Sequence, residues 1–337
     1  MRFSVLTAAL LLPLLAPAQA PRFTTIGRVV AQVPAFNQLI APGTPIEVVA
    51  SGLSHAEGPL WVPDSTMLLF SDSPTRTIYR WSERNGLSKF LESSGFSGRM
   101  PYGKEPGTNG LALDAQGNLL LAEHGDRRVA LLPLGQPGGK RTLTDAFAGR
   151  RYNSPNDVVA HPSGSIYFSD PPFGLPQQAQ SPLREQPGNY VYRRRPDGRV
   201  SPEITDLTLP NGLALSADGR QLFVSQSDSL RPVLMAYPVR GNGKLGAGQV
   251  FFDMRPLPRR PKEVPDGLKL DRAGNVWASG HGGVVVISPQ GQHLGTIDVG
   301  EVVSNCAWGD DGRTLYFTAG SLVCRVKTLV QGTTGGR

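Results

Sequence analysis

The stretch NGLALSADGRQLFVS, residues 211–225, decides the fold of this chain. A polar residue opens a short apolar run, an Asp-Gly turn interrupts it, and a second apolar run follows. Glycine in such a turn supplies the positive φ that a tight hairpin needs. The stretch therefore predicts two antiparallel strands joined by a hairpin.

The same plan occurs six times along the chain, at intervals of 39 to 55 residues. A third apolar strand follows each pair, and a fourth follows five of the six third strands. Repeats of four short strands are typical of propeller blades. In each repeat the first strand begins at one polar residue, and these residues are Glu57, Asn109, Asn156, Asn211, Asp266 and Asn305.

The sixth repeat lacks an outer strand, because its third strand at residues 322–327 is followed only by a tail rich in Gly and Thr. A suitable strand is available at residues 46–51. We therefore predict an all-β, six-bladed β-propeller of four-stranded blades, forming a single domain over residues 40–330. Its ring is closed by an N-terminal strand in the last blade. An open solenoid would need polar capping repeats at its ends, and the sequence shows none.

Residues 1–18 have the pattern of a signal peptide. Arg2 precedes an apolar run over residues 5–16, and A-x-A patterns permit cleavage after Ala18 or Ala20. The run is shorter than the roughly 20 residues that span a bilayer, although an uncleaved anchor is the alternative. We expect a periplasmic or secreted protein without a membrane anchor.

The charge and composition of the chain limit the classes of molecule that it is expected to bind. The formal net charge is +7, but the basic clusters at residues 193–195 and 259–262 are not interleaved with aromatic residues. Single-stranded nucleic acids are bound by combining both features, so we expect no nucleic-acid partner. A closed propeller of this size can stand alone, and we expect a monomer that acts on a small molecule.

The two cysteines are expected to remain free thiols. Cys306 lies on the first predicted strand of the last repeat and Cys324 on the third. The second strand separates them by about twice the 4.7–4.9 Å strand spacing. A disulfide requires Cα atoms within about 7 Å of each other.

The polar residues that begin the first strands converge on one end of the central channel. Two carboxylates and several amides form a ligand set made only of oxygen atoms, with neither His nor Cys. Such a set suits Ca²⁺ first, then Mg²⁺ or Mn²⁺, and Zn²⁺ less well. The alternative is that each Asn side chain ties neighbouring strands together by hydrogen bonds. We predict one divalent cation, most suitably Ca²⁺.

The chain resembles the gluconolactonase branch of the SMP-30/regucalcin-like (SGL) family over about residues 50–327. The motifs that carry the resemblance are EGPLW at 57–61, EPGTNGL at 105–111, EHGDRR at 123–128, NSPNDV at 153–158, SDPPFG at 169–174, LPNGL at 209–213, VPDG at 264–267 and HLGTI at 293–297.

This resemblance implies a divalent metal held by Glu57, Asn156, Asn211 and Asp266, with Asn109 beside it in contact with the substrate or a water. It also implies a metal-dependent hydrolase that opens a sugar lactone. The metal would polarise the lactone carbonyl group. Water attack would be assisted either by Asp266 as a general base or by the metal itself.

Long loops beside the first strands are expected to select the substrate. In the loop at residues 96–108, Arg99, Tyr102 and Lys104 are candidate sugar contacts. His124 is a further candidate substrate contact, with a packed structural histidine as the alternative. Two other functions stay open: hydrolysis of other lactones, aryl esters or phosphotriesters, and a periplasmic binding propeller whose metal is structural.

Overall fold

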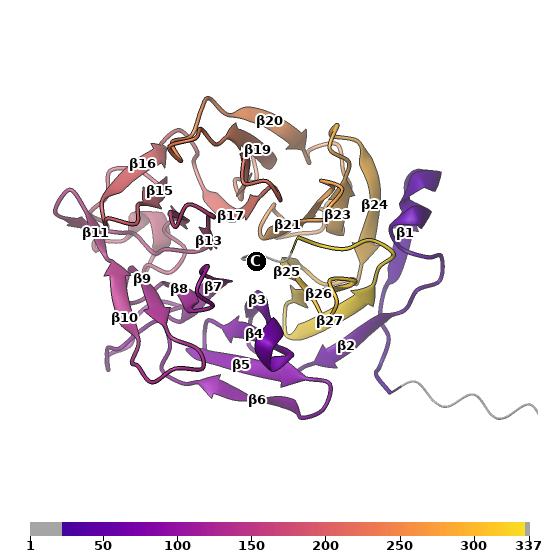
Figure 1. The fold of residues 1–337 in the computed structure, drawn as a ribbon, viewed down its shortest axis with the longest axis horizontal. Helices are drawn as coiled ribbons and strands as arrows, with labels where there is room; N and C mark the ends of the chain where they lie inside the picture. Colours follow the sequence, from indigo (N-terminus) through magenta and orange to yellow (C-terminus); the bar gives the residue numbers. More distant parts are fainter. Residues whose placement is uncertain (1–21, 334–337) are drawn as a thin grey trace, which may run out of the picture.

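The computed structural model describes residues 22–333 and shows an all-β ring of six blades (Figure 1). The predicted fold class is therefore confirmed. The predicted signal peptide lies outside the described residues. Within residues 22–333, the helices are all too short and too polar to cross a membrane.

Each blade is a four-stranded antiparallel core sheet whose first strand lies nearest the centre of the ring (Figure 1). The first blade contains β3 (Ala56–Val62), β4 (Met67–Asp72), β5 (Thr77–Ser82) and β6 (Gly86–Leu91). The second contains β7 (Thr108–Leu113), β8 (Leu119–Glu123), β9 (Arg128–Leu132) and β10 (Arg141–Thr144). The third contains β13 (Val158–Ala160), β14 (Ile166–Asp170), β15 (Tyr190–Arg194) and β16 (Val200–Ile204). The fourth blade contains β17 (Pro210–Leu215), β18 (Gln221–Gln226), β19 (Val233–Pro238) and β20 (Gln249–Asp253). The fifth contains β21 (Leu268–Leu270), β22 (Val276–Gly280), β23 (Gly283–Ile287) and β24 (His293–Asp298). The sixth contains β25 (Val303–Gly309), β26 (Thr314–Ala319), β27 (Leu322–Lys327) and β2 (Ile46–Ala50).

The ring closes as predicted. Strand β2 pairs antiparallel with β27, with Ile46 opposite Val326 and Glu47 opposite Arg325. The last blade therefore joins the two ends of the described chain (Figure 1).

Several elements were not predicted from the sequence. Strand β1 (Arg28–Ala31) adds a fifth strand to the outer edge of β24 in the fifth blade. A short hairpin joins β11 (Ala146–Phe147) to β12 (Arg150–Arg151). The described part of the chain also contains three 3₁₀ helices, namely η1 (Pro34–Gln38), η2 (Pro63–Ser65) and η3 (Gln178–Gln180).

The last blade confirms the prediction for the cysteines. Phe317 on β26 pairs with Cys306 on one side and with Cys324 on the other. The intervening strand therefore separates the two thiols, and both are free and buried.

The apolar core lies between neighbouring blades. Between the second and third blades, Leu120, Val129, Phe168 and Tyr192 pack in one buried cluster. Burying a large apolar side chain stabilises the fold by roughly 1.5–3 kcal/mol. Each interface between blades therefore contributes strongly to holding the ring together.

Serine hydroxyl groups hold several neighbouring blades together near the centre. Ser71 Oγ donates to the carbonyl oxygen of Asn109 at 2.9 Å, and Ser225 Oγ donates to that of Asp266 at 2.5 Å. These bonds link the second strand of one blade to the residues that begin the following blade. The backbone of the predicted site is thereby fixed by the blade before it.

Candidate metal centre

Two carboxylates from different blades act on each other at the centre of the ring. Glu57 lies at the start of β3 and is buried, whereas Asp266 lies two residues before β21 and stays partly accessible. Burial raises the pKa of Asp266 well above its usual range, and the negative charge of Glu57 raises it further. A cation between two such groups would remove this unfavourable interaction.

Asn156 is oriented by a histidine from the second blade. Its Nδ2 donates to His124 Nε2 at 3.3 Å, and His124 Nδ1 donates to the carbonyl oxygen of Glu105 at 3.0 Å. His124 is fully buried, and burial lowers its pKa, so the ring is neutral and can accept at Nε2. Because the amide nitrogen is held in this way, Asn156 Oδ1 is left as the group that can bind a cation.

Asn211 has the same arrangement with a serine. Its Nδ2 donates to Ser227 Oγ at 2.9 Å, and Ser227 Oγ donates to the carbonyl oxygen of Pro265 at 2.6 Å. Pro265 directly precedes Asp266, so this chain of bonds also positions the second carboxylate. Two carboxylates and two oriented amides are the hard oxygen donors that Ca²⁺ prefers, so the residues fit the predicted cation.

His55 provides a positive charge beside Glu57. Its Nε2 lies 3.7 Å from Glu57 Oε1, and the hydrogen bond to Glu57 raises the pKa of His55 to about 9. Glu57 Oε2 accepts the backbone N–H of Gly58 at 3.0 Å. Glu57 is therefore held from two sides.

The remaining two asparagines at strand starts differ from this pattern. Asn305 Oδ1 accepts the backbone N–H of Cys306 at 2.8 Å, so its amide oxygen stabilises the strand. This bond joins adjacent residues of one strand, so it does not test the alternative that these asparagines tie neighbouring strands together. Asn109 is buried at the start of the second blade, beside the expected ligands in the ring.

The predicted substrate contacts lie in different surroundings. Arg99 is exposed on its loop. Tyr102 packs against Phe96 with ring centroids 4.7 Å apart, and its hydroxyl group is buried without a hydrogen-bond partner among the described residues. His124 is fully buried with both ring nitrogens engaged, which favours a positioning role toward Asn156. Direct contact with a substrate stays a prediction for all three.

Sequence reasoning assigned no role to Glu105, whose negative charge acts on Asp266, His124 and His55. The residue lies in a loop, outside the repeat that identified the other candidates. Its position four residues before Asn109 was the available signal. Together with the buried Asp157, Glu105 adds to the negative charge that acts on Asp266.

Within residues 22–333, no three His, Cys, Asp or Glu side chains form a group that could hold a metal. The candidate centre therefore depends on its amide oxygens. The fold and this arrangement define a class of protein: six-bladed propellers with an acidic, amide-lined site on their central axis.

Comparison with known proteins names the family. Residues 55–321 match the SMP-30/gluconolactonase/LRE-like region, and the chain belongs to this family. This confirms the resemblance found in the sequence motifs.

Individual relatives are similar over most of their length. The chain is 36% identical over 316 residues to a gluconolactonase of Zymomonas mobilis, covering 92% of this chain and 88% of the relative. It is 26% identical over 283 residues to the pentonolactonase XacC of Haloferax volcanii, covering 82% and 84%. The solved structure of a gluconolactonase from Xanthomonas campestris is 29% identical with a TM-score of 0.78, covering 93% of this chain and 99% of that one.

Proposed function

We propose that this protein is a metal-dependent hydrolase that opens sugar lactones. One observation carries the proposal: the carboxylates of Glu57 and Asp266, from different blades, act on each other, and Asn211 is hydrogen-bonded to both Asp266 and Ser227. The 36% and 29% identical gluconolactonases support the substrate class.

Each residue has a distinct part in this proposal. Glu57, Asn156, Asn211 and Asp266 hold the cation, which when bound stabilises negative charge developing on the lactone carbonyl oxygen. Asp266, the more accessible of the two carboxylates, would take a proton from the attacking water, or the bound cation would lower the pKa of that water. His124 and Ser227 keep the two amides in the orientation that presents oxygen.

We propose Ca²⁺ as the cation, because all four donors are hard oxygen atoms. The test is hydrolysis of glucono-δ-lactone, measured by acid release. Purified protein is assayed as prepared, after EDTA, and after Ca²⁺, Mg²⁺, Mn²⁺ or Zn²⁺ is restored. We expect EDTA to abolish activity and Ca²⁺ to restore it best.

Two variants accompany this test. Asp266→Asn should be inactive in every metal, whereas Asp197→Asn, at an exposed aspartate remote from the site, should behave as the wild type. Full activity in EDTA, or in Asp266→Asn, would refute the proposed site.

A five-carbon aldonolactone is the second candidate substrate, because the pentonolactonase relative is 26% identical over most of both chains. An aryl ester and a phosphotriester complete the panel. Cleavage of the aryl ester or the phosphotriester without cleavage of any lactone would show that the protein is not a lactonase. Binding of gluconolactone without turnover of any compound would instead indicate a binding protein.

We also propose that the mature protein is a periplasmic or secreted monomer. The pattern of residues 1–18 supports the location. Cell fractionation with N-terminal sequencing of the mature chain tests the location, and light scattering tests the oligomeric state. A cytoplasmic protein with residues 1–18 retained, or a stable dimer, would contradict these assignments.

A further inference from the structure

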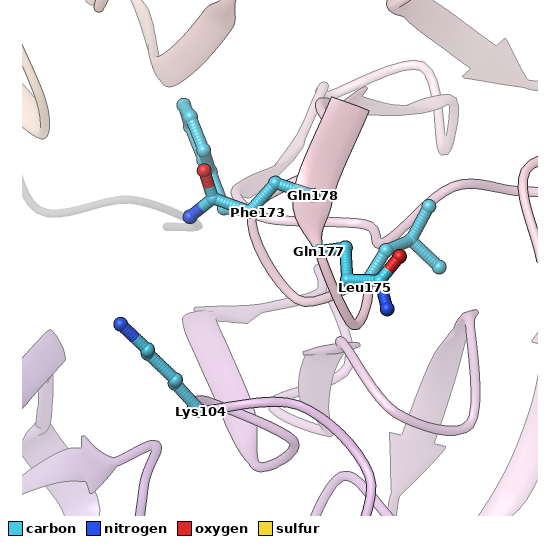
Figure 2. Close-up of a pocket in the computed structure, with 5 residues that line it drawn as sticks. All are labelled: Lys104, Phe173, Leu175, Gln177 and Gln178. Carbon is cyan, nitrogen blue, oxygen red and sulfur yellow. The ribbon is translucent and has the colours of Figure 1, made fainter. Parts of the chain in front are cut away.

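A cavity of about 280 Å³ lies between two loops and is lined by Lys104, Phe173, Leu175, Gln177 and Gln178. Its volume is close to the lower end of the range for small-molecule sites, about 300–1,000 Å³. Figure 2 shows Lys104 on one loop and the other four residues on the segment across from it. Within this set, Lys104 alone carries a charge.

Both walls of the cavity are joined to the candidate metal centre. On one side, the residue after Lys104 is Glu105, whose carbonyl oxygen accepts from His124. On the other side, the N–H of Gly174 donates to Ser154 Oγ at 3.0 Å, two residues before Asn156. A Cβ atom on Gly174 would lie 2.3 Å from His124 Cβ, so this wall packs directly on the histidine that orients Asn156.

The wall opposite Lys104 has a locally strained backbone. Gln177 and Gln178 are consecutive residues with φ of 61° and 50°, in the left-handed region that residues with a side chain rarely adopt. Leu175 is buried, and its carbonyl oxygen accepts the N–H of Gln178 at 3.0 Å. Strain of this kind persists where the surrounding structure enforces it, and it concentrates at binding sites.

The residues that line the cavity can provide the apolar contacts and hydrogen bonds that a sugar derivative makes. The half-buried ring of Phe173 can pack against C–H groups, and the exposed amides of Gln177 and Gln178 can bond hydroxyl groups. Lys104 is exposed and forms no ion pair with any residue in the described range 22–333. Its ammonium group therefore keeps its full capacity for an anionic group on a ligand.

We propose that this cavity is the subsite for the end of the lactone remote from its carbonyl group. Lys104 there favours sugar lactones with an anionic substituent, such as a phosphate, sulfonate or carboxylate group. The inference rests on the proposed lactonase function and specifies its substrate class. The reacting carbonyl lies at the metal centre while the substituent lies against Lys104.

The test compares two lactones that differ by one phosphate group, glucono-δ-lactone and 6-phosphoglucono-δ-lactone. Lys104→Met keeps most of the side chain and removes the charge. We expect kcat/KM for the phosphorylated lactone to fall about three- to fivefold and that for the neutral lactone to change less than about 1.5-fold. Lys104→Arg should retain the preference, and Lys104→Glu should lose more than Lys104→Met.

Binding to the wild type and Lys104→Met is measured separately by calorimetry with gluconate and 6-phosphogluconate, so that the two proposals can fail independently. Tighter binding of 6-phosphogluconate that depends on Lys104, without hydrolysis of either lactone, would support the subsite and refute the lactonase. Equal effects of Lys104→Met on both lactones, or equal binding of both acids, would refute the subsite and leave the lactonase standing.

Discussion

The side-chain amide of Asn156 donates to Nε2 of His124 over 3.3 Å, and this contact determines which end of the amide is free. His124 is itself held in one tautomer, because its Nδ1 donates to a carbonyl oxygen. His124 thus determines which atom of the Asn156 amide is free to bind a cation.

Replacing His124 by glutamine should therefore weaken metal binding. Groups that orient ligands in this way typically account for about 10- to 100-fold in metal affinity. Calorimetric titration of EDTA-treated protein with Ca²⁺ measures the change, with His161→Gln, in a turn away from the centre, as the matched control. Unchanged affinity in His124→Gln would show that Asn156 keeps its orientation without the histidine.

Removing the cation should lower the thermal stability of the wild type. The carboxylates of Glu57 and Asp266 repel each other in a buried setting, and bound metal removes this cost. A ligand at 100 times its Kd adds about 2.7 kcal/mol to the free energy of unfolding. Scanning calorimetry with Ca²⁺ or EDTA should show a large difference in Tm for the wild type and almost none for Asp266→Asn. If Ca²⁺ changed the Tm of both proteins equally, the cation would bind at a site that does not include Asp266.

Asp170 should make stability depend on pH. It is fully buried, and burial raises the pKa of its carboxyl group to about 7, although Oδ2 accepts the N–H of Asn153 at 2.8 Å. Because the folded state holds the proton more tightly than the unfolded state, stability is lost as pH rises from about 4 through 7. The slope is at most about 1.4 kcal/mol per pH unit.

Urea unfolding of the wild type and Asp170→Asn between pH 4.5 and 8 measures this contribution. The variant lacks the titrating group, so its free energy of unfolding should increase relative to that of the wild type as pH rises. Parallel pH profiles for the two proteins would contradict the raised pKa.

Arg325 should be important for ring closure. It bonds Glu47 on β2 and Glu83 of the first blade, each at 2.6 Å, and its guanidinium group lies 4.7 Å from the ring of Phe23. We expect Arg325→Met to lower the free energy of unfolding by about 2–3 kcal/mol, because the partly buried Glu47 and the exposed Glu83 both lose a hydrogen bond to a charged partner. Arg199→Met, which removes an exposed pair with Asp197, should cost less than about 1 kcal/mol. Similar losses in both variants would show that closure does not depend on Arg325.

The sequence predicted the blades well because their signals are local. Apolar runs bounded by turns predicted the third strand of the last repeat at residues 322–327, and the structure has it at Leu322–Lys327. Strand β1 was missed for the opposite reason. It is four residues long, and what makes it a strand is its pairing with β24, far along the chain.

The candidate site shows the same limit. Its position at the strand starts follows from the repeat, but Asn211 and Asn305 stand in similar local contexts. The family resemblance included Asn211 and not Asn305 among the ligands, and the structure supplies a physical difference: Asn305 Oδ1 accepts a backbone N–H, whereas Asn211 Nδ2 donates to Ser227 Oγ. Hydrogen-bond partners contributed by other strands leave no trace in a local motif.

The pairing of β2 with β27 sets the order of events in synthesis. Residues 46–50 leave the ribosome early, yet their partner at residues 322–327 is made almost at the end of the chain. Until then β2 is an unpaired edge open to other strands, including those of a second nascent chain. Every chain that stops before residue 322 would carry that open edge permanently, so incomplete copies would be prone to aggregation and degradation.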